Sequence, residues 1–323
     1  MNLFARLLPV AIAALALGHA AEARTIFVSN EAGNTITVLD GETFDIVTEV
    51  RVGQRPRGIQ LSPDASRLYI CASEDDIIQV MDTETFEIIG TLPSGPDPET
   101  MILSPDGRLI YVANEDDNLV SVVDVEKATI IAEIPVGVEP EGMGIRPDGK
   151  VVVNTSETTN MAHFIDTETL EITDNVLGDA RPRIAEYTAD GAEVWVSAEI
   201  GGTVAVIDDA TRAIKHTIGF EVAGVPGEAI QPVGVRITSD RAKAYVALGP
   251  ANRVAVVDAQ TYEVKDYLLV GQRVWQLAFS PDEKFLYSTN GVSNDISVID
   301  VDSDRVIRSV AVGSFPWGVA VKD

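Results

Sequence analysis

The chain has 323 residues, with 50 acidic and 24 basic side chains and a formal net charge of −26 at pH 7. Such an excess of negative charge repels phosphate backbones and anionic headgroups, so we expect no nucleic-acid partner and no membrane insertion. Cys71 is the only cysteine, which excludes an internal disulfide and a Cys-x-x-Cys-His haem attachment. Its setting in "RLYICAS" favours a buried thiol over a reactive one.

Residues 1–23 have the features of an export signal. Arg6 precedes an apolar run from Leu7 to Gly18, and Ala21-Glu22-Ala23 places small residues at the cleavage-determining positions. The run is too short to span a bilayer as a helix. We therefore expect cleavage near Ala23 and a periplasmic mature protein.

The rest of the chain consists of blocks that repeat one pattern, which predicts a single repeat domain over residues 24–323. Most blocks have 42 residues, whereas the fifth has 50. The extra length falls in "GFEVAGVPGEAIQPVG", which is expected to overhang the mouth of the central channel as a lid or a partner contact, or to be a tolerated insertion. The seven blocks are 24–65, 66–107, 108–149, 150–191, 192–241, 242–283 and 284–323.

The third block shows the elements of every block. "LIYVAN", "LVSVVD", "ATIIAEIPV" and "EGMGI" are rich in β-branched residues and read as four short strands. Turn signals such as Pro147-Asp148-Gly149 separate them, and no helical periodicity occurs. The pattern predicts an all-β, seven-bladed propeller with four-stranded blades.

The two ends of residues 24–323 predict how the ring closes. This segment begins with "TIFVSN", a second strand, and ends with "FPWGVAV", a first strand. The C-terminal strand should therefore pair with the N-terminal blade of residues 24–51, which removes an open sheet edge.

A recurring strand motif carries a family resemblance. It reads "YVAN" at Tyr111–Asn114, "FVSN" at Phe27–Asn30, "YVAL" at Tyr245–Leu248 and "YSTN" at Tyr287–Asn290. The chain resembles the YVTN family of β-propellers, and is most like exported members associated with catabolism dependent on pyrroloquinoline quinone (PQQ). That resemblance implies a dehydrogenase or transport system as partner. It implies no particular site residues, because a scaffold does not determine chemistry.

Two residues flanking the first proline of each repeat vary while their frame persists. Pro-x-Gly marks the entry into the innermost strand, and the "SPDG" turn marks its exit at the opposite end. The variable pairs should therefore surround one mouth of the central channel. In ring order they are Arg55 and Arg57, Asp97 and Glu99, Glu139 and Glu141, Arg181 and Arg183, Gln231 and Val233, Arg273 and Trp275, and Phe315 and Trp317.

The composition of this mouth predicts a ligand or partner site. Arginine binds carboxylates bidentately, and tryptophan stacks on planar rings. We expect a carboxylated or planar small molecule, such as PQQ, or a partner protein. The predicted ligand-binding residues are Arg55, Arg57, Arg181, Arg183, Arg273, Trp275, Phe315 and Trp317.

Three alternatives remain open at this stage. Arg55 and Arg57 could pair with Asp97 and Glu99, and Arg181 and Arg183 with Glu139 and Glu141, as salt bridges between blades. Asp97, Glu99, Glu139 and Glu141 could instead hold a divalent metal in a lactonase-like hydrolase, or the propeller could be a pure interaction scaffold. The acidic loops "NEAGN", "SEDDI", "NEDDN" and "SETTN" are expected to be solvated turns. No catalytic residue or resident cofactor is assigned, and we expect a monomeric, non-enzymatic protein.

Overall fold

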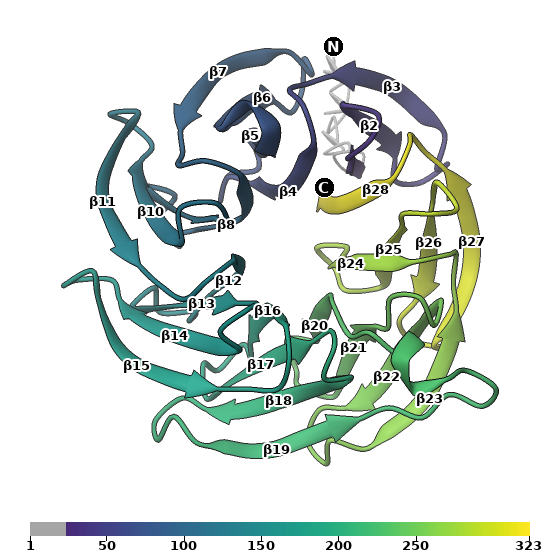
Figure 1. Cartoon of the computed structure of the whole chain (residues 1–323). Helices are drawn as coiled ribbons and strands as arrows, with labels where there is room; N and C mark the ends of the chain where they lie inside the picture. The colour runs from purple at the N-terminus through teal and green to yellow at the C-terminus, as the bar shows by residue number, and fades with distance from the viewer. Residues whose placement is uncertain (1–23) are drawn as a thin grey trace, which may run out of the picture.

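The computed structural model describes residues 24–323, so the predicted export signal and its cleavage site lie outside the described residues. Seven four-stranded antiparallel sheets stand around a central axis, as predicted (Figure 1). Within residues 24–323, no helix is long and apolar enough to cross a membrane.

The blades follow one another in chain order, each running from the axis outward. Blade one contains β28 (Pro316–Lys322), β1 (Thr25–Asn30), β2 (Thr35–Asp40) and β3 (Ile46–Arg51). Blade two contains β4 (Pro56–Leu61), β5 (Arg67–Ala72), the 3₁₀ turn η1 (Ser73–Asp75), β6 (Ile77–Asp82) and β7 (Ile88–Pro93). Blade three contains β8 (Pro98–Leu103), β9 (Leu109–Asn114), β10 (Leu119–Asp124) and β11 (Thr129–Pro135).

The remaining four blades repeat this order. Blade four contains β12 (Pro140–Ile145), β13 (Val151–Ser156), β14 (Met161–Asp166) and β15 (Glu171–Leu177). Blade five contains β16 (Pro182–Tyr187), β17 (Glu193–Ala198), β18 (Thr203–Asp208) and β19 (Ile214–Gly219). Blade six contains β20 (Val235–Ile237), β21 (Lys243–Ala247), β22 (Arg253–Asp258) and β23 (Val264–Leu269), after the 3₁₀ turn η2 (Gly227–Ala229). Blade seven contains β24 (Val274–Phe279), β25 (Phe285–Asn290), β26 (Asp295–Asp300) and β27 (Arg305–Ala311).

The hydrophobic core lies between neighbouring blades rather than in one central mass. Tyr69 and Ile78 of blade two pack against Met101 and Val112 of blade three, and equivalent clusters fill the other junctions. The middle strands are buried on both faces because a blade packs on each side of them, whereas outer strands such as β3 are largely exposed. Cys71 is fully buried in one of these clusters, as predicted, and burial raises the pKa of its thiol.

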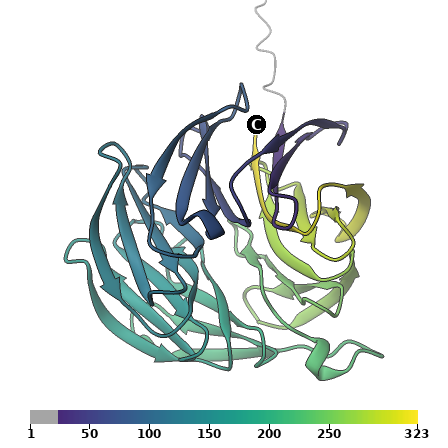
Figure 2. The ribbon, with the colours of Figure 1, turned by 45° about the horizontal axis from the view of Figure 1, so that its top comes forward.

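The longer fifth block forms a loop between β19 and β20. Phe220, Val222 and Ile230 anchor it in the core between blades five and six. Its residues around Gly224 are exposed. In Figure 2 the green loop that contains the turn before β20 projects from the ring at the lower right. The anchored ends fix the loop to the blades, and only the tip is free to contact another molecule.

The ring closes as the sequence predicted. β28 pairs antiparallel with β1, with Val28 opposite Val319 and Thr25 opposite Lys322. Figure 1 shows the yellow β28 completing the purple N-terminal blade. Arg24 Nε lies 3.0 Å from Asp323 Oδ1, so an ion pair joins the two ends of the described chain.

Deletion of residues 314–323 should destabilise the whole ring rather than one blade. The deletion removes the buried side chains of Trp317 and Val319, which contribute about 3–6 kcal/mol together, and exposes two sheet edges. Chemical unfolding should show this loss in one cooperative transition. Deletion of Asp323 alone, which removes only an exposed ion pair, is the control; a truncated protein as stable as this control would contradict the closure.

Candidate functional site

The first residue of each variable pair is held at the mouth by two neighbouring blades. Its backbone is left-handed in six of the seven repeats, with φ between 48° and 59°. Its N–H donates to a side-chain oxygen of the preceding blade, as Arg55 does to Asn34 Oδ1 at 2.9 Å. Its carbonyl accepts a hydrogen bond from its own blade, as Arg55 does from the N–H of Ser73 at 3.2 Å. The six residues are Arg55, Asp97, Glu139, Arg181, Arg273 and Phe315.

The glycine of the frame has a steric cause in the blades that contain it. Thr100, Ile184 and Gln276 take its place in the other three blades. A Cβ atom on Gly58 would lie 2.8 Å from the carbonyl oxygen of Glu99, and one on Gly318 would lie 2.7 Å from that of Arg57. The inner strands approach so closely that a side chain cannot fit at these positions.

One half of the mouth is an ion-pair network between blades two, three and four. Arg55 Nη1 lies 2.8 Å from Asp97 Oδ1, and its Nη2 lies 2.9 Å from Glu99 Oε1. Arg57 Nε lies 2.7 Å from Glu99 Oε2, and its Nη2 lies 3.3 Å from Glu141 Oε1. These contacts link three successive inner strands near the axis.

The other half joins blades four to seven. Arg183 Nη2 lies 2.7 Å from Glu141 Oε1, and Arg183 also contacts Glu157. Arg181 Nε lies 2.7 Å from Glu157 Oε2 and 3.3 Å from Glu199 Oε2. Arg273 Nη2 lies 2.9 Å from Glu199 Oε1. Glu141 therefore connects the two halves, because both Arg57 and Arg183 contact it.

Burial raises the pKa of the carboxylates in this network, and the neighbouring arginines counteract this effect to different degrees. Burial opposes ionisation of Glu141, but Arg183 and Arg57 hold its pKa below the ordinary value. Burial raises the pKa of Glu99 well above its ordinary value, and it raises the pKa of Glu115 as well. Burial also raises the pKa of Glu157 to about 7, against the attraction of Arg183. Burial thus outweighs the attraction of the arginines at Glu99, Glu115 and Glu157, but not at Glu141.

The salt bridges anticipated between blades are present in part. Arg55 and Arg57 pair with Asp97 and Glu99 as that alternative required, and Arg183 pairs with Glu141. Arg181 and Glu139 do not pair with each other. Arg181 contacts Glu157 and Glu199, whereas Glu139 accepts a hydrogen bond from Thr158.

Four glutamates that face the mouth were not among the predicted site residues. They follow the second strand of a blade, and three lie in loops expected to be solvated turns. That expectation is wrong for Glu157, which is buried because its loop folds over the mouth and meets Arg183. The sequence signal was the recurrence of glutamate directly after these strands, at Glu31, Glu115, Glu157 and Glu199.

The predicted aromatic residues have three different environments. Trp317 is only 2% exposed, and Arg57 lies over its ring at 4.7 Å from the centroid. Trp275 is half-buried, with Arg273 over its ring at 4.3 Å and Arg183 at 5.8 Å. Phe315 is 41% exposed. Trp275 and Phe315 therefore offer surface at the rim, while Trp317 is part of the packed wall.

An acidic group partly matches the alternative metal site. Carboxylate oxygens of Asp97, Glu99 and Glu115 lie within 4.8 Å of one another. Glu139 and Glu141 do not belong to this group. Arg55 contacts both Asp97 and Glu99, so positive charge from the chain itself already occupies the position next to these oxygens.

The buried and the exposed arginine of one pair should differ in their effect on stability. The Arg183 side chain is 4% exposed, whereas that of Arg181 is 47% exposed. Arg183→Leu leaves Glu141 and its neighbours without a counter-charge and should lower the free energy of unfolding by about 3–5 kcal/mol. Arg181→Leu should cost less than about 1 kcal/mol. Urea unfolding measures both; equal effects would contradict the network as described.

Glu157 should make the protein less stable as the pH rises. Its folded pKa of about 7 exceeds the value of 4.5 for a free glutamate, so the folded state binds more protons between these values. The free energy of unfolding should therefore fall between pH 5 and pH 7. Glu157→Gln should match the parent at pH 5 and flatten this decline. Glu87→Gln, on an exposed outer segment, is the control, and an unchanged slope in Glu157→Gln would contradict the assignment.

Comparisons with known proteins agree on the architecture. The family model of the cytochrome D1 heme domain matches residues 69–183. No curated protein matches the sequence. Hydrazine synthase from Kuenenia stuttgartiensis is similar at 24% identity and a TM-score of 0.77, over 86% of this chain and 92% of that one.

Two further structures show the same fold at lower identity. A candidate 6-phosphogluconolactonase from Bacteroides fragilis is 17% identical, with a TM-score of 0.79 over 95% of this chain and 99% of that one. The dihydro-heme d1 dehydrogenase NirN is 14% identical, with a TM-score of 0.70 over 92% of this chain and 74% of that one. The chain is thus a seven-bladed β-propeller similar in fold to lactonase-like and D1-heme-domain proteins.

Proposed function

We propose that this protein is an exported, non-enzymatic binding protein whose channel mouth takes up a small planar molecule bearing carboxylates. The observation that carries the proposal is the convergence of Arg183 and Arg273 on the ring of Trp275. Arg181 lies next to them, because it shares Glu199 with Arg273. Burial, together with the positive charges of Arg183 and Arg181, lowers the pKa of Arg273 although Glu199 opposes this. A carboxylate bound there would relieve the repulsion between these guanidinium groups.

The neighbouring aromatic groups supply the planar part of such a site. Trp275 Nε1 is a buried donor with no hydrogen-bond partner among the described residues. A Cβ built on Gly291 would lie 2.9 Å from Trp275 Cδ1 and 3.6 Å from the carbonyl of Pro316, so the rim bearing Phe315 adjoins the indole. A planar ligand could pair with Arg273 and Arg181 and lie against the exposed face of Phe315.

PQQ is the ligand we propose to test first, because it combines a planar quinone with several carboxylates. The resemblance to exported PQQ-associated propellers supports a role beside an alcohol-oxidising dehydrogenase or a transport system. The matched family model and NirN are both named for haem, another planar group. The two histidines of the described chain do not lie in this mouth: His163 accepts from the N–H of Gly137, and His216 stacks on Tyr262.

A metal-assisted hydrolase is the second candidate. The group of Asp97, Glu99 and Glu115 and the fold similarity to a candidate lactonase favour it. Arg55 and Arg57 compete with a cation for the same oxygens, so we rank it below ligand binding. A scaffold for a partner protein would use Phe315 and the exposed loop tip instead.

Titration with PQQ at moderate salt should give saturable calorimetric heat and quench tryptophan fluorescence. Arg273→Gln removes a charge-assisted contact and should weaken binding about 10- to 100-fold. Trp275→Phe should remove most of the quenching, whereas Trp195→Phe, at a buried position in blade five, should leave quenching and affinity unchanged.

Repeating the assays with added calcium or with a chelator distinguishes small-molecule binding from the metal-assisted hydrolase. Absence of heat and quenching up to millimolar PQQ would contradict the small-molecule proposal and favour a protein partner at the mouth. Calcium-dependent hydrolysis of a lactone, lost in Asp97→Asn, would favour the hydrolase instead.

A further inference from the structure

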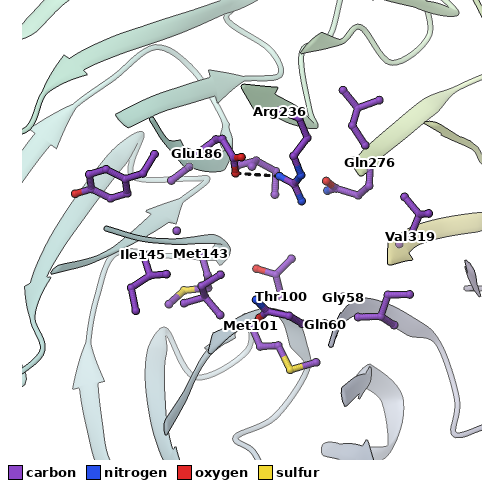
Figure 3. Close-up of a pocket in the computed structure, with 18 of the residues that line it drawn as sticks. Gly58, Gln60, Thr100, Met101, Met143, Ile145, Glu186, Arg236, Gln276 and Val319 are labelled. Carbon is purple, nitrogen blue, oxygen red and sulfur yellow. Dashed lines mark hydrogen bonds and ion pairs between the residues drawn. The ribbon is translucent and has the colours of Figure 1, made fainter. Parts of the chain in front are cut away.

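A cavity lies on the propeller axis, and Trp317 at the charged mouth forms part of its lining. It has a volume of about 250 Å³ and is lined by the inner strands of all seven blades (Figure 3). This exceeds the roughly 150 Å³ of an engineered apolar cavity that admits benzene. The cavity is therefore large enough for a small organic molecule.

The mouth network separates this cavity from the proposed PQQ site. Trp317 lines the cavity, and the Arg57 guanidinium covers its ring on the mouth side. Arg273 and Phe315 do not line it. In the other direction the lining includes Pro147, in the turn that follows β12, so the cavity extends toward the opposite face of the ring.

Three polar side chains at one side of the cavity carry no net charge together, and one of them has an unpaired hydrogen-bond donor. Glu186 Oε2 lies 3.0 Å from Arg236 Nη1, and the two charges cancel. Gln276 is 7% exposed, and its Nε2 has no hydrogen-bond partner among the described residues. Figure 3 shows its amide directed toward Arg236. A buried N–H without an acceptor is unfavourable, so this donor indicates where a ligand oxygen would bind.

Most of the remaining wall is apolar. Gln60 and Thr100 are further polar side chains in it: Gln60 Oε1 accepts from the N–H of Leu103, and the Thr100 hydroxyl donates to the carbonyl of Glu141. Met101, Met143 and Ile145 lie on one side in Figure 3, and Val319 lies on the other. Leu277 also lines the cavity. Methionine side chains adapt to ligands of different shape. The cavity thus combines a few polar groups with an adaptable hydrophobic surface, the usual composition of a small-molecule site.

We propose that this cavity binds a small neutral molecule that carries one hydroxyl or primary amide on a compact apolar group. The ligand oxygen accepts from Gln276 Nε2, and its O–H or N–H donates to the Glu186 carboxylate. A carboxylate ligand is disfavoured, because it would lie beside Glu186 while Arg236 is already paired. This site does not depend on the function proposed for the mouth.

Methionine methyl resonances test the proposal in the unmodified sequence. Met101 and Met143 line the cavity, whereas Met81 and Met161 do not. Benzyl alcohol or hexanamide, added up to about 10 mM because ligands of this size bind weakly, should shift the Met101 and Met143 signals alone. Hexanoate should bind at least fivefold more weakly than hexanamide. No shift with either neutral probe, or a preference for hexanoate, would overturn the proposal.

Variants then locate the bound probe. Gln276→Leu removes the unpaired donor and should weaken hexanamide binding at least fivefold without destabilising the fold. Val319→Phe fills the cavity and should abolish the methyl shifts. Arg273→Gln, at the mouth, should leave them unchanged. Shifts that persist in Val319→Phe, or that vanish in Arg273→Gln, would place the probe elsewhere and contradict the site.

Discussion

The pairing of β28 with β1 is the constraint on which the remaining structure depends. Once the C-terminal strand occupies the inner position of blade one, all seven inner strands must converge on one axis. Their approach leaves no space for side chains at Gly58 and Gly318 and places the variable residues before these glycines around a common opening. Closure therefore produces both the channel and its charged mouth.

Because so many ionisable groups converge on the axis, their opposite charges must pair with one another. Glu141 is buried between Arg57 and Arg183, and it joins two halves of a network that spans most of the ring. The charges are not fully paired at either end of this network. Carboxylates exceed their counter-charges near Glu99, and guanidiniums crowd together near Arg273. A ligand gains most where such repulsion can be relieved, which is why the Arg273 side is the better binding candidate.

The periodic sequence predicted the fold almost completely, because each block carries four strand patterns and its own turns. For the site, the sequence predicted which residues lie around the mouth but not how their side chains contact one another. Repeat phasing identified the residues that surround the mouth, but it could not show that Trp317 is covered by Arg57 or that Glu157 folds inward. These contacts join residues far apart in the chain, and they depend on loop conformation and side-chain packing. The axial cavity was not foreseen, since the polar residues that lie closest together in it, Glu186, Arg236 and Gln276, belong to different repeats without a shared motif.

The central claim is that paired charges at the axis connect the blades. A double-mutant cycle across one blade junction tests this claim most directly. Arg57 and Glu99 belong to blades two and three, and their charged atoms approach to 2.7 Å in a buried setting. Replacing each with leucine, singly and together, isolates their coupling from the loss of packing. The account predicts a coupling free energy of unfolding of at least about 1.5 kcal/mol, with the double variant more stable than the single changes predict. A coupling below about 0.5 kcal/mol, the range of independent sites, would contradict it.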